Sequence, residues 1–282
     1  MIRTRIALTP SGHLFLGGAR VALAIALHAH RHNGTLILRV DDLDSERCKP
    51  AFVDSMQRDL SWFGVVWQQC VLQSERSDLY QSAIQRLKDT GRLYPCFESD
   101  VELRAKADHN RKRGKPTIYD RAMLRMTDAQ REAAEAGGKR PYWRFRLSDG
   151  VVAWQDLVAG PRDAKLPSIS DPILVKSDGT PTAMLASVVD DIELGITHVI
   201  HGMDSVANVG AQLDIRAALR RNAVQMTFAQ VPATEDTEAR AMRRFASQTV
   251  RAARGDGFLP SVLAAYLIRD GLPANIAAAP LS

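Results

Sequence analysis

The sequence has few cysteines and no long apolar run. There are three cysteines among 282 residues. Cys48, Cys70 and Cys96 lack the CxxC spacing of a thiolate zinc site and the pattern of a disulfide framework, so we predict no metal site. No stretch of eighteen apolar residues is present, and the first residues lack an apolar segment followed by a cleavage site. These absences predict a cytoplasmic protein without membrane association.

The composition leaves the partner open. Hydrophobic residues form 45% of the chain, and its length suffices for one large α/β domain with an insertion or for two modest domains. Lys plus Arg exceeds Asp plus Glu by 5 (37 against 32). This excess suits an anionic partner such as tRNA or a nucleotide. Many proteins that never contact nucleic acid carry a similar charge, and the sequence does not indicate an oligomeric state.

Residues 1–44 predict a strand, a helix and a second strand. Residues 2–7 alternate as in a strand, and a helix with apolar residues on all sides begins after the loop, at Gly17. Residues 35–40 (TLILRV) are typical of a strand inside a parallel sheet. Acidic residues follow this strand at Asp41, Asp42 and Asp44. The pattern therefore predicts a ligand site at the carboxyl edge of a parallel sheet.

The rest of the chain alternates helical and strand patterns. Residues 148–150 (SDG) are typical of a hairpin turn between strands at 142–147 and 151–156. We expect residues 171–176 to return the chain to the first sheet. The other predicted elements are helices at 50–63, 73–87, 127–138, 208–220 and from 258 onward, and a strand at 196–201.

Four stretches resemble signatures of the glutamyl-tRNA synthetases, members of the class I aminoacyl-tRNA synthetases. Residues 4–20 (TRIALTPSGHLFLGGAR) resemble T-R-I-A-P-S-P-T-G-x-L-H-I-G-x-A-R, and residues 39–47 (RVDDLDSER) resemble R-I-E-D-T-D-x-x-R. Residues 74–80 (SERSDLY) resemble the end of Q-S-E-R-x-x-x-Y, and residues 177–191 resemble S-D-G-x-P-T-Y-x-x-A-x-V-V-D-D. Four signatures in the family's own order argue against chance similarity.

The resemblance implies an α/β fold with a Rossmann-like, doubly wound parallel sheet. It assigns residues 1–93 and 171–235 to this catalytic-type core, 94–170 to an inserted α+β subdomain, and 236–282 to a second ATP loop and the start of a helical stem. No anticodon-binding domain is expected in the chain. In the family the insertion grips the acceptor end of tRNA. In this chain the basic residues of the insertion would either bind tRNA phosphates or form a solvated helix end. They are Arg111, Lys112, Arg113 and Lys115.

The family's ATP motifs are altered. The tetrad that reads HIGH in the family is Phe15, Leu16, Gly17 and Gly18, so its histidine, a hydrogen-bond donor, is replaced by phenylalanine. His13 is either a substitute donor or a solvent-exposed loop residue. The family's K-x-S-K loop aligns with residues 240–244, where the serine and both lysines are lost. Three arginines remain in the loop, namely Arg240, Arg243 and Arg244. Either they still bind a phosphate, with Mg and ATP as the ligands, or the loop has decayed.

The implied amino-acid pocket is also changed. Asp41 replaces the glutamate that receives the substrate ammonium, Ala183 replaces a tyrosine, and His201 replaces the arginine that holds the side-chain carboxylate. We therefore expect a pocket that suits a larger or less acidic amine, or that no longer binds one. The paired Asp190 and Asp191 are either structural or catalytic. The remaining carried-over positions are Arg5, Ala7, Thr9 and Ser187 for the amino acid and Gly17, Gly18 and Asp204 for the nucleotide.

Three hypotheses follow from these changes. The first is a paralogue with redirected aminoacyl activation or transfer, of ligase type, in a biosynthetic or modification pathway. The second is an inactive paralogue that binds an amino acid, a nucleotide, the tRNA end or a protein. The third, a glutamate-tRNA ligase, is disfavoured because both ATP motifs are altered together. Zinc-binding family members place several cysteines in the insertion, where this chain has only Cys96, so no zinc is expected.

Overall fold

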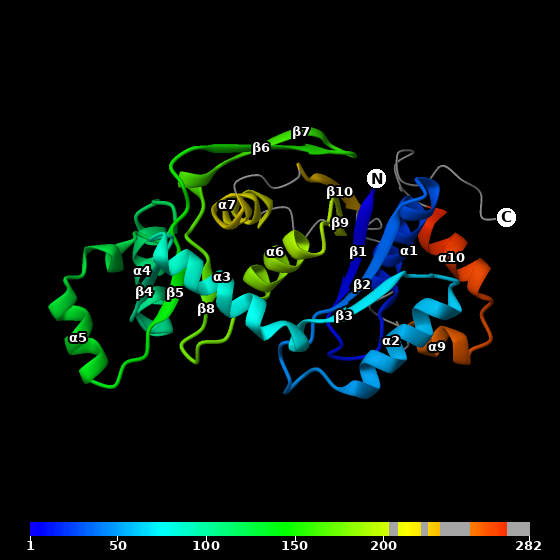
Figure 1. Ribbon diagram of the computed structural model, residues 1–282, viewed down its shortest axis with the longest axis horizontal. Helices are drawn as coiled ribbons and strands as arrows, with labels where there is room; N and C mark the ends of the chain where they lie inside the picture. The colour runs from blue at the N-terminus through cyan, green and yellow to red at the C-terminus, as the bar shows by residue number, and fades with distance from the viewer. Residues whose placement is uncertain (203–207, 221–224, 232–248, 270–282) are drawn as a thin grey trace.

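The computed structural model describes residues 1–202, 208–220, 225–231 and 249–269. It has the α/β architecture that the sequence predicts (Figure 1). β1 (Arg3–Leu8) and β2 (Thr35–Val40) are parallel neighbours joined by α1 (Leu16–Arg31). α2 (Pro50–Trp62) then leads to β3 (Gln69–Leu72), which pairs in parallel with β2. The predicted strand, helix and strand of residues 1–44 are confirmed.

A second group of strands continues the arrangement beside β1. The amide N of Thr197, just before β9 (His198–Gly202), donates to the carbonyl of Arg3 at 2.9 Å. β9 contacts β1, although the two strands belong to different hydrogen-bonded sheets. β9 pairs in parallel with β10 (Thr227–Val231), and β10 pairs with β6 (Val151–Asp156). The carboxyl ends of these strands therefore share one edge, where α/β folds bind ligands.

Helices cover both faces of the parallel strands (Figure 1). α1, α2, α9 (Val250–Gly255) and α10 (Pro260–Arg269) enclose a core that includes Leu36 and Leu38 of β2. Ile37, between them, points to the opposite core, which includes residues of α7 (Val209–Leu219). Because β2 is buried on both faces, its sequence is apolar apart from Thr35 and Arg39 instead of alternating.

A separate antiparallel sheet is formed mostly by residues of the predicted insertion, together with β8, which follows it in the chain (Figure 1). Its strand order is β4-β5-β8, and α4 and α5 each begin with a reciprocal capping box, at Ser99 with Glu102 and at Thr127 with Gln130. The exposed helix predicted after Thr127 is confirmed. The bounds here are α3 (Ser77–Asp89), β4 (Leu93–Cys96), α4 (Asp100–Lys112), α5 (Asp128–Ala136), β5 (Tyr142–Phe145), β7 (Gly160–Lys165), β8 (Ile173–Val175) and α6 (Ala183–Glu193), with 3₁₀ turns at Gln73–Arg76, Ala122–Arg125 and Leu166–Ser168.

The hairpin predicted around residues 148–150 is wrong. β5 and β6 belong to different sheets, and β6 instead pairs with β7 from Val151↔Lys165 to Asp156↔Gly160. The Asp-Gly turn is held by α7, because Asp214 accepts hydrogen bonds from the amide and hydroxyl of Ser148, both at 2.8 Å. A long-range carboxylate therefore overrides the local turn signal. β6 lies in the segment predicted as an insertion and contributes to the β9-β10 sheet.

The expectation that residues 171–176 return to the parallel sheet is also wrong. β8 pairs antiparallel with β5. Asp171, just before β8, is buried and accepts hydrogen bonds from Tyr94, Arg121 and the amide of Leu147 at 2.7–3.0 Å. These bonds fix the strand in the antiparallel sheet. Within the described residues, no helix is both long and apolar enough to cross a membrane.

Candidate functional site

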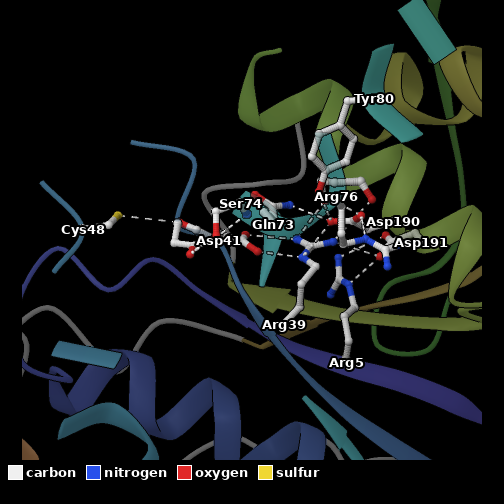
Figure 2. A network of polar contacts seen from close by, with 12 residues as sticks. Arg5, Arg39, Asp41, Cys48, Gln73, Ser74, Arg76, Tyr80, Asp190 and Asp191 are labelled. Carbon is white, nitrogen blue, oxygen red and sulfur yellow. Dashed lines mark hydrogen bonds and ion pairs between the residues drawn. The ribbon is translucent and has the colours of Figure 1, made fainter. Parts of the chain in front are cut away.

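A buried network of arginines and aspartates lies at the carboxyl edge of β1 and β2 (Figure 2). β1 and β2 supply Arg5 and Arg39, and the end of α6 supplies Asp190 and Asp191. Because β1 and β2 are paired in register, the two arginine side chains emerge on the same face. Asp191 of α6 contacts both arginines, and Oδ2 of Asp190 lies 3.8 Å from Arg39 Nε.

Arg5, a predicted amino-acid ligand, is engaged by Asp191. Its Nε donates to Oδ1 at 2.9 Å and its Nη2 to Oδ2 at 3.3 Å, a bidentate pair. Asp191 also accepts from Arg39 Nη1 at 3.2 Å. Both members of the Arg5–Asp191 pair are buried. The positive charge of Arg5 is thus matched within the fold.

Arg39 forms a second bidentate pair with Asp41, the predicted ammonium ligand. Arg39 Nε donates to Oδ1 at 2.7 Å and Nη2 to Oδ2 at 3.1 Å. Arg39 Nη2 also donates to Ser187 Oγ at 3.1 Å. Burial raises the pKa of Asp41, and the Arg39 charge opposes this rise. Burial alone would lower the pKa of Arg39, but Asp41 and its neighbours raise it. The sequence analysis did not single out Arg39, although a charged residue in an apolar strand was the available signal.

Asp190 joins the segment after β3 to α6. It is fully buried and accepts hydrogen bonds from Gln73 Nε2 at 2.8 Å, Arg76 Nε at 2.7 Å and the Tyr80 hydroxyl at 3.0 Å. Burial, followed by the charge of Asp190, raises the pKa of Tyr80. Of the two interpretations of Asp190, these contacts favour the structural one.

The acidic residues after β2 do not converge on one point. Asp42 accepts hydrogen bonds from the amide and hydroxyl of Ser74, at 2.9 and 2.7 Å, and Asp44 pairs with the exposed Arg47. In the described part of the chain, no three His, Cys, Asp or Glu side chains are grouped to hold a metal ion. The expectations of no zinc and of ATP with Mg stay predictions.

His201 lies beside this network as a neutral imidazole. Its Nδ1 donates to the carbonyl of Gly202 at 3.1 Å, while its buried Nε2 has no hydrogen-bond partner among the described residues. Burial lowers the pKa of His201, and the charge of Arg5 lowers it further. The ring packs edge-on against Phe228, with 6.2 Å between the ring centroids.

Two further buried polar groups accompany His201. Gln230 is its register neighbour on β10, and Asp156 ends β6. Gln230 Nε2 and Asp156 Oδ2 also lack hydrogen-bond partners in the described ranges. The sequence analysis missed both residues. Gln230 stands in an apolar strand, which was the available signal, whereas the position of Asp156 depends on the unexpected pairing of β6 with β10.

The remaining predicted amino-acid positions surround the network. Ala7 is half-buried on β1, and Thr9 is exposed in the following turn. Ala183 is exposed at the first position of α6, and Ser187 lies one helical turn later, in contact with Arg39. The structure therefore brings Arg5, Asp41, Ser187 and His201 to one region, and their role as ligands stays a prediction.

The predicted nucleotide side begins at α1. Phe15 is 60% exposed just before the helix and provides no side-chain cap. A Cβ atom on Gly17 would meet no atom within 4 Å, whereas one on Gly18 would lie 3.2 Å from Leu14 Cδ1. Open space thus adjoins Gly17, whereas a side chain at position 18 would be crowded by Leu14. The positions Asp204, Arg240, Arg243 and Arg244 lie outside the described residues.

The basic segment of the insertion ends α4 and is exposed. Arg111 forms an ion pair with Asp108 of the same helix at 2.7 Å, so one cation of the basic segment is engaged locally. Cys96 is buried near the Tyr119 hydroxyl, which donates to Glu98 at 2.6 Å. Burial, the largest cause, raises the pKa of Cys96 to about 11. Its thiol is therefore protonated near neutral pH.

Comparisons with known proteins agree with this architecture. Residues 1–279 match the family model described as the catalytic domain of class I tRNA synthetases (E and Q). A protein from Acidiphilium cryptum named Glutamate--tRNA ligase 2 is 48% identical over 272 residues, which cover 96% of this chain and 61% of that relative. One from Gluconacetobacter diazotrophicus with the same name is 48% identical over 271 residues, with the same coverage. The chain thus spans less than two thirds of these curated relatives.

Solved structures support the same fold. A glutamate-tRNA synthetase from Elizabethkingia anophelis superimposes with a TM-score of 0.84 at 24% identity, over 98% of this chain and 63% of that one. At this identity the similarity concerns the fold alone.

Proposed function

The chain belongs to the catalytic-domain family of the class I tRNA synthetases for glutamate and glutamine, and on that premise we propose that it is a paralogue which binds a zwitterionic amino acid with an uncharged side chain. The proposal includes a nucleotide at the Gly17 edge, with Mg and ATP as ligands, and activation or transfer of the aminoacyl group to an acceptor other than the usual tRNA. The amino acid would lie over the network of Figure 2.

The balance of charge around His201 carries the proposal. The region contains four arginines and four aspartates, of which Arg76 and Asp41 are half-buried and the other six are buried: Arg5, Arg39, Arg76 and Arg216 with Asp41, Asp156, Asp190 and Asp191. The imidazole of His201 is neutral, since its pKa is lowered. No cation is in surplus among the described residues of this region. An additional side-chain carboxylate would therefore enter without a matching charge, which is costly in a buried site.

Three groups would hold the ligand. Asp41 would accept hydrogen bonds from the ammonium group, and Arg5 would direct its remaining N–H donors at a carboxylate or carbonyl oxygen. His201 Nε2 would accept a hydrogen bond from an amide or hydroxyl of the ligand side chain, because its Nδ1 already carries the proton. Of these atoms, His201 Nε2 has no hydrogen-bond partner among the described residues.

Weak ATP chemistry is the second part of the proposal. Phe15 offers no donor where a phosphate oxygen would develop charge, and loss of one such donor costs on the order of a hundred- to a thousand-fold in rate. This observation also favours the alternative function, a binding paralogue without activation chemistry. Contact of the insertion with a tRNA acceptor end is a further proposal, supported by the exposed basic end of α4.

Pyrophosphate exchange with a panel of amino acids tests the proposal. Exchange with an uncharged amino acid would support activation, while binding of that amino acid without exchange would support the alternative. The variant Phe15→His with Arg243→Lys should raise exchange, because a donor and a mobile cation return together. Strong exchange with glutamate by the unaltered protein, followed by charging of its ordinary tRNA, would contradict the proposal.

A further inference from the structure

His13 joins three segments that are distant in the sequence. It lies in the turn between β1 and α1, its Nδ1 is 2.9 Å from Ser55 Oγ on α2, and its Nε2 is 3.1 Å from Arg251 Nη1 on α9. The edge of the ring also packs against Phe52, at 5.3 Å between centroids. The sequence offered two interpretations, a substitute donor or a solvent-exposed residue, whereas both ring nitrogens are engaged by protein groups.

The contacts fix the direction of the hydrogen bonds. A guanidinium can only donate, so Nε2 of His13 accepts from Arg251. The proton of the neutral ring is then on Nδ1 and is donated to Ser55 Oγ. Ser55 is buried, which places one end of this chain of hydrogen bonds inside the α2 packing.

The backbone of the same turn is attached to α9. The amide of Val250 donates to the carbonyl of Leu14 at 2.9 Å, and Phe15 forms an antiparallel bridge with Thr249. Thr249 caps α9 through its hydroxyl. Consecutive residues of the turn therefore contact consecutive residues at the start of α9, and the His13–Arg251 pair closes this junction on the outside.

We infer that His13 is a positioning residue, which with Ser55 and Arg251 holds the turn before Gly17 in the geometry required for nucleotide binding. The inference rests on the proposed nucleotide site at that edge. Loss of the His13–Arg251 contact would leave the backbone links of the turn to α9 without their side-chain support. Gly17 and Gly18, in the first turn of α1, would then have a wider range of positions. Binding of a phosphate group would have to order them, so it would be weaker, although the core stays folded.

Arg254 provides a matched control on the same helix. Its Nη1 lies 3.4 Å from Oδ1 of the buried Asp59, so it links α9 to α2 without contacting the turn. Arg251 and Arg254 are both cations of α9, but only Arg251 contacts the turn, so an effect of lost charge on α9 alone should be common to both variants.

The test measures binding of ATP with Mg to the full chain by calorimetry, together with amide hydrogen exchange of residues 11–16. His13→Leu and Arg251→Gln should each weaken binding about tenfold, the equivalent of one hydrogen bond to a charged group, and the double variant should lose little more. Arg251→Lys, which retains a donor, should recover part of the affinity. Arg254→Gln should leave affinity and exchange in the turn unchanged.

Two results would overturn the inference. One is an equal loss of affinity in Arg254→Gln, which would indicate a general effect of α9. The other is strictly additive losses in the double variant. If the unaltered chain binds no nucleotide, the proposed function fails by itself. Hydrogen exchange then decides the positioning role, with faster exchange in His13→Leu and Arg251→Gln supporting it and unchanged exchange contradicting it.

Discussion

Arg39 and Asp41, two residues apart at the end of β2, form a bidentate ion pair at 2.7 and 3.1 Å. The pair holds the carboxylate that is proposed to receive the substrate ammonium, and Arg39 is almost completely buried. Residues two apart on a strand share a face, so the backbone of β2 brings the two groups together. The orientation of the Asp41 carboxylate is thus set by β2 and the residue that follows it.

Arg39→Gln should strongly destabilise the protein. The change leaves Asp41 and Asp191 in a buried region with one cation fewer, and breaking a buried pair in this way costs about 3–5 kcal/mol. Urea unfolding measures the loss. Arg47→Gln, which breaks the exposed pair with Asp44, is the matched control and should leave the midpoint unchanged. Equal midpoints for both variants would refute a central role for Arg39.

Tyr80→Phe should cost about 1 kcal/mol in the free energy of unfolding, because Asp190 loses one hydrogen bond but keeps those from Gln73 and Arg76. Thermal unfolding provides the measurement. Tyr266→Phe on α10, where the ring is 37% exposed, serves as the control. A larger loss in the control than in Tyr80→Phe would contradict the role of Asp190 in joining α3 to α6.

Stability should depend on His198 below neutral pH. Burial lowers the pKa of His198, and the nearby His32 and amino terminus lower it further. The unfolded chain, in which histidine has a pKa of about 6.5, then binds a proton that the folded chain does not, so stability is lost as pH falls below about 6.5. Comparison of unfolding at about pH 7.5 and about pH 5.5 should show a smaller loss for His198→Gln than for the unaltered protein. Equal losses would exclude this origin.

Much of the fold is predictable from local patterns. The strand at 35–40 and the helix beginning near Gly17 are predictable because elements that are buried on two faces have mostly apolar sequences. The helix after Thr127 follows from its capping box with Gln130. The errors at residues 148–150 and 171–176 have one cause: Asp214 and Asp171 hold these segments through contacts distant in the sequence.

The candidate site was predictable in position but not in connectivity. Arg5 and Asp41 belong to one network, in which Asp191 and Arg39 connect them. The sequence could not indicate that each is matched by a buried partner, because the pairing depends on how α6 crosses β1 and β2. The proximity of Asp156 to His201 likewise depends on the pairing of β6 with β10, which no local pattern encodes.

Calorimetric titration with glutamine and glutamate, which differ in side-chain charge but hardly in shape, tests the central claim most directly. The unaltered protein should bind the uncharged member at least about tenfold more tightly, and His201→Arg should reverse the preference by supplying a cation for the carboxylate. His198→Gln, at the start of the same strand, should leave the preference unchanged. Tighter binding of glutamate by the unaltered protein would contradict the account.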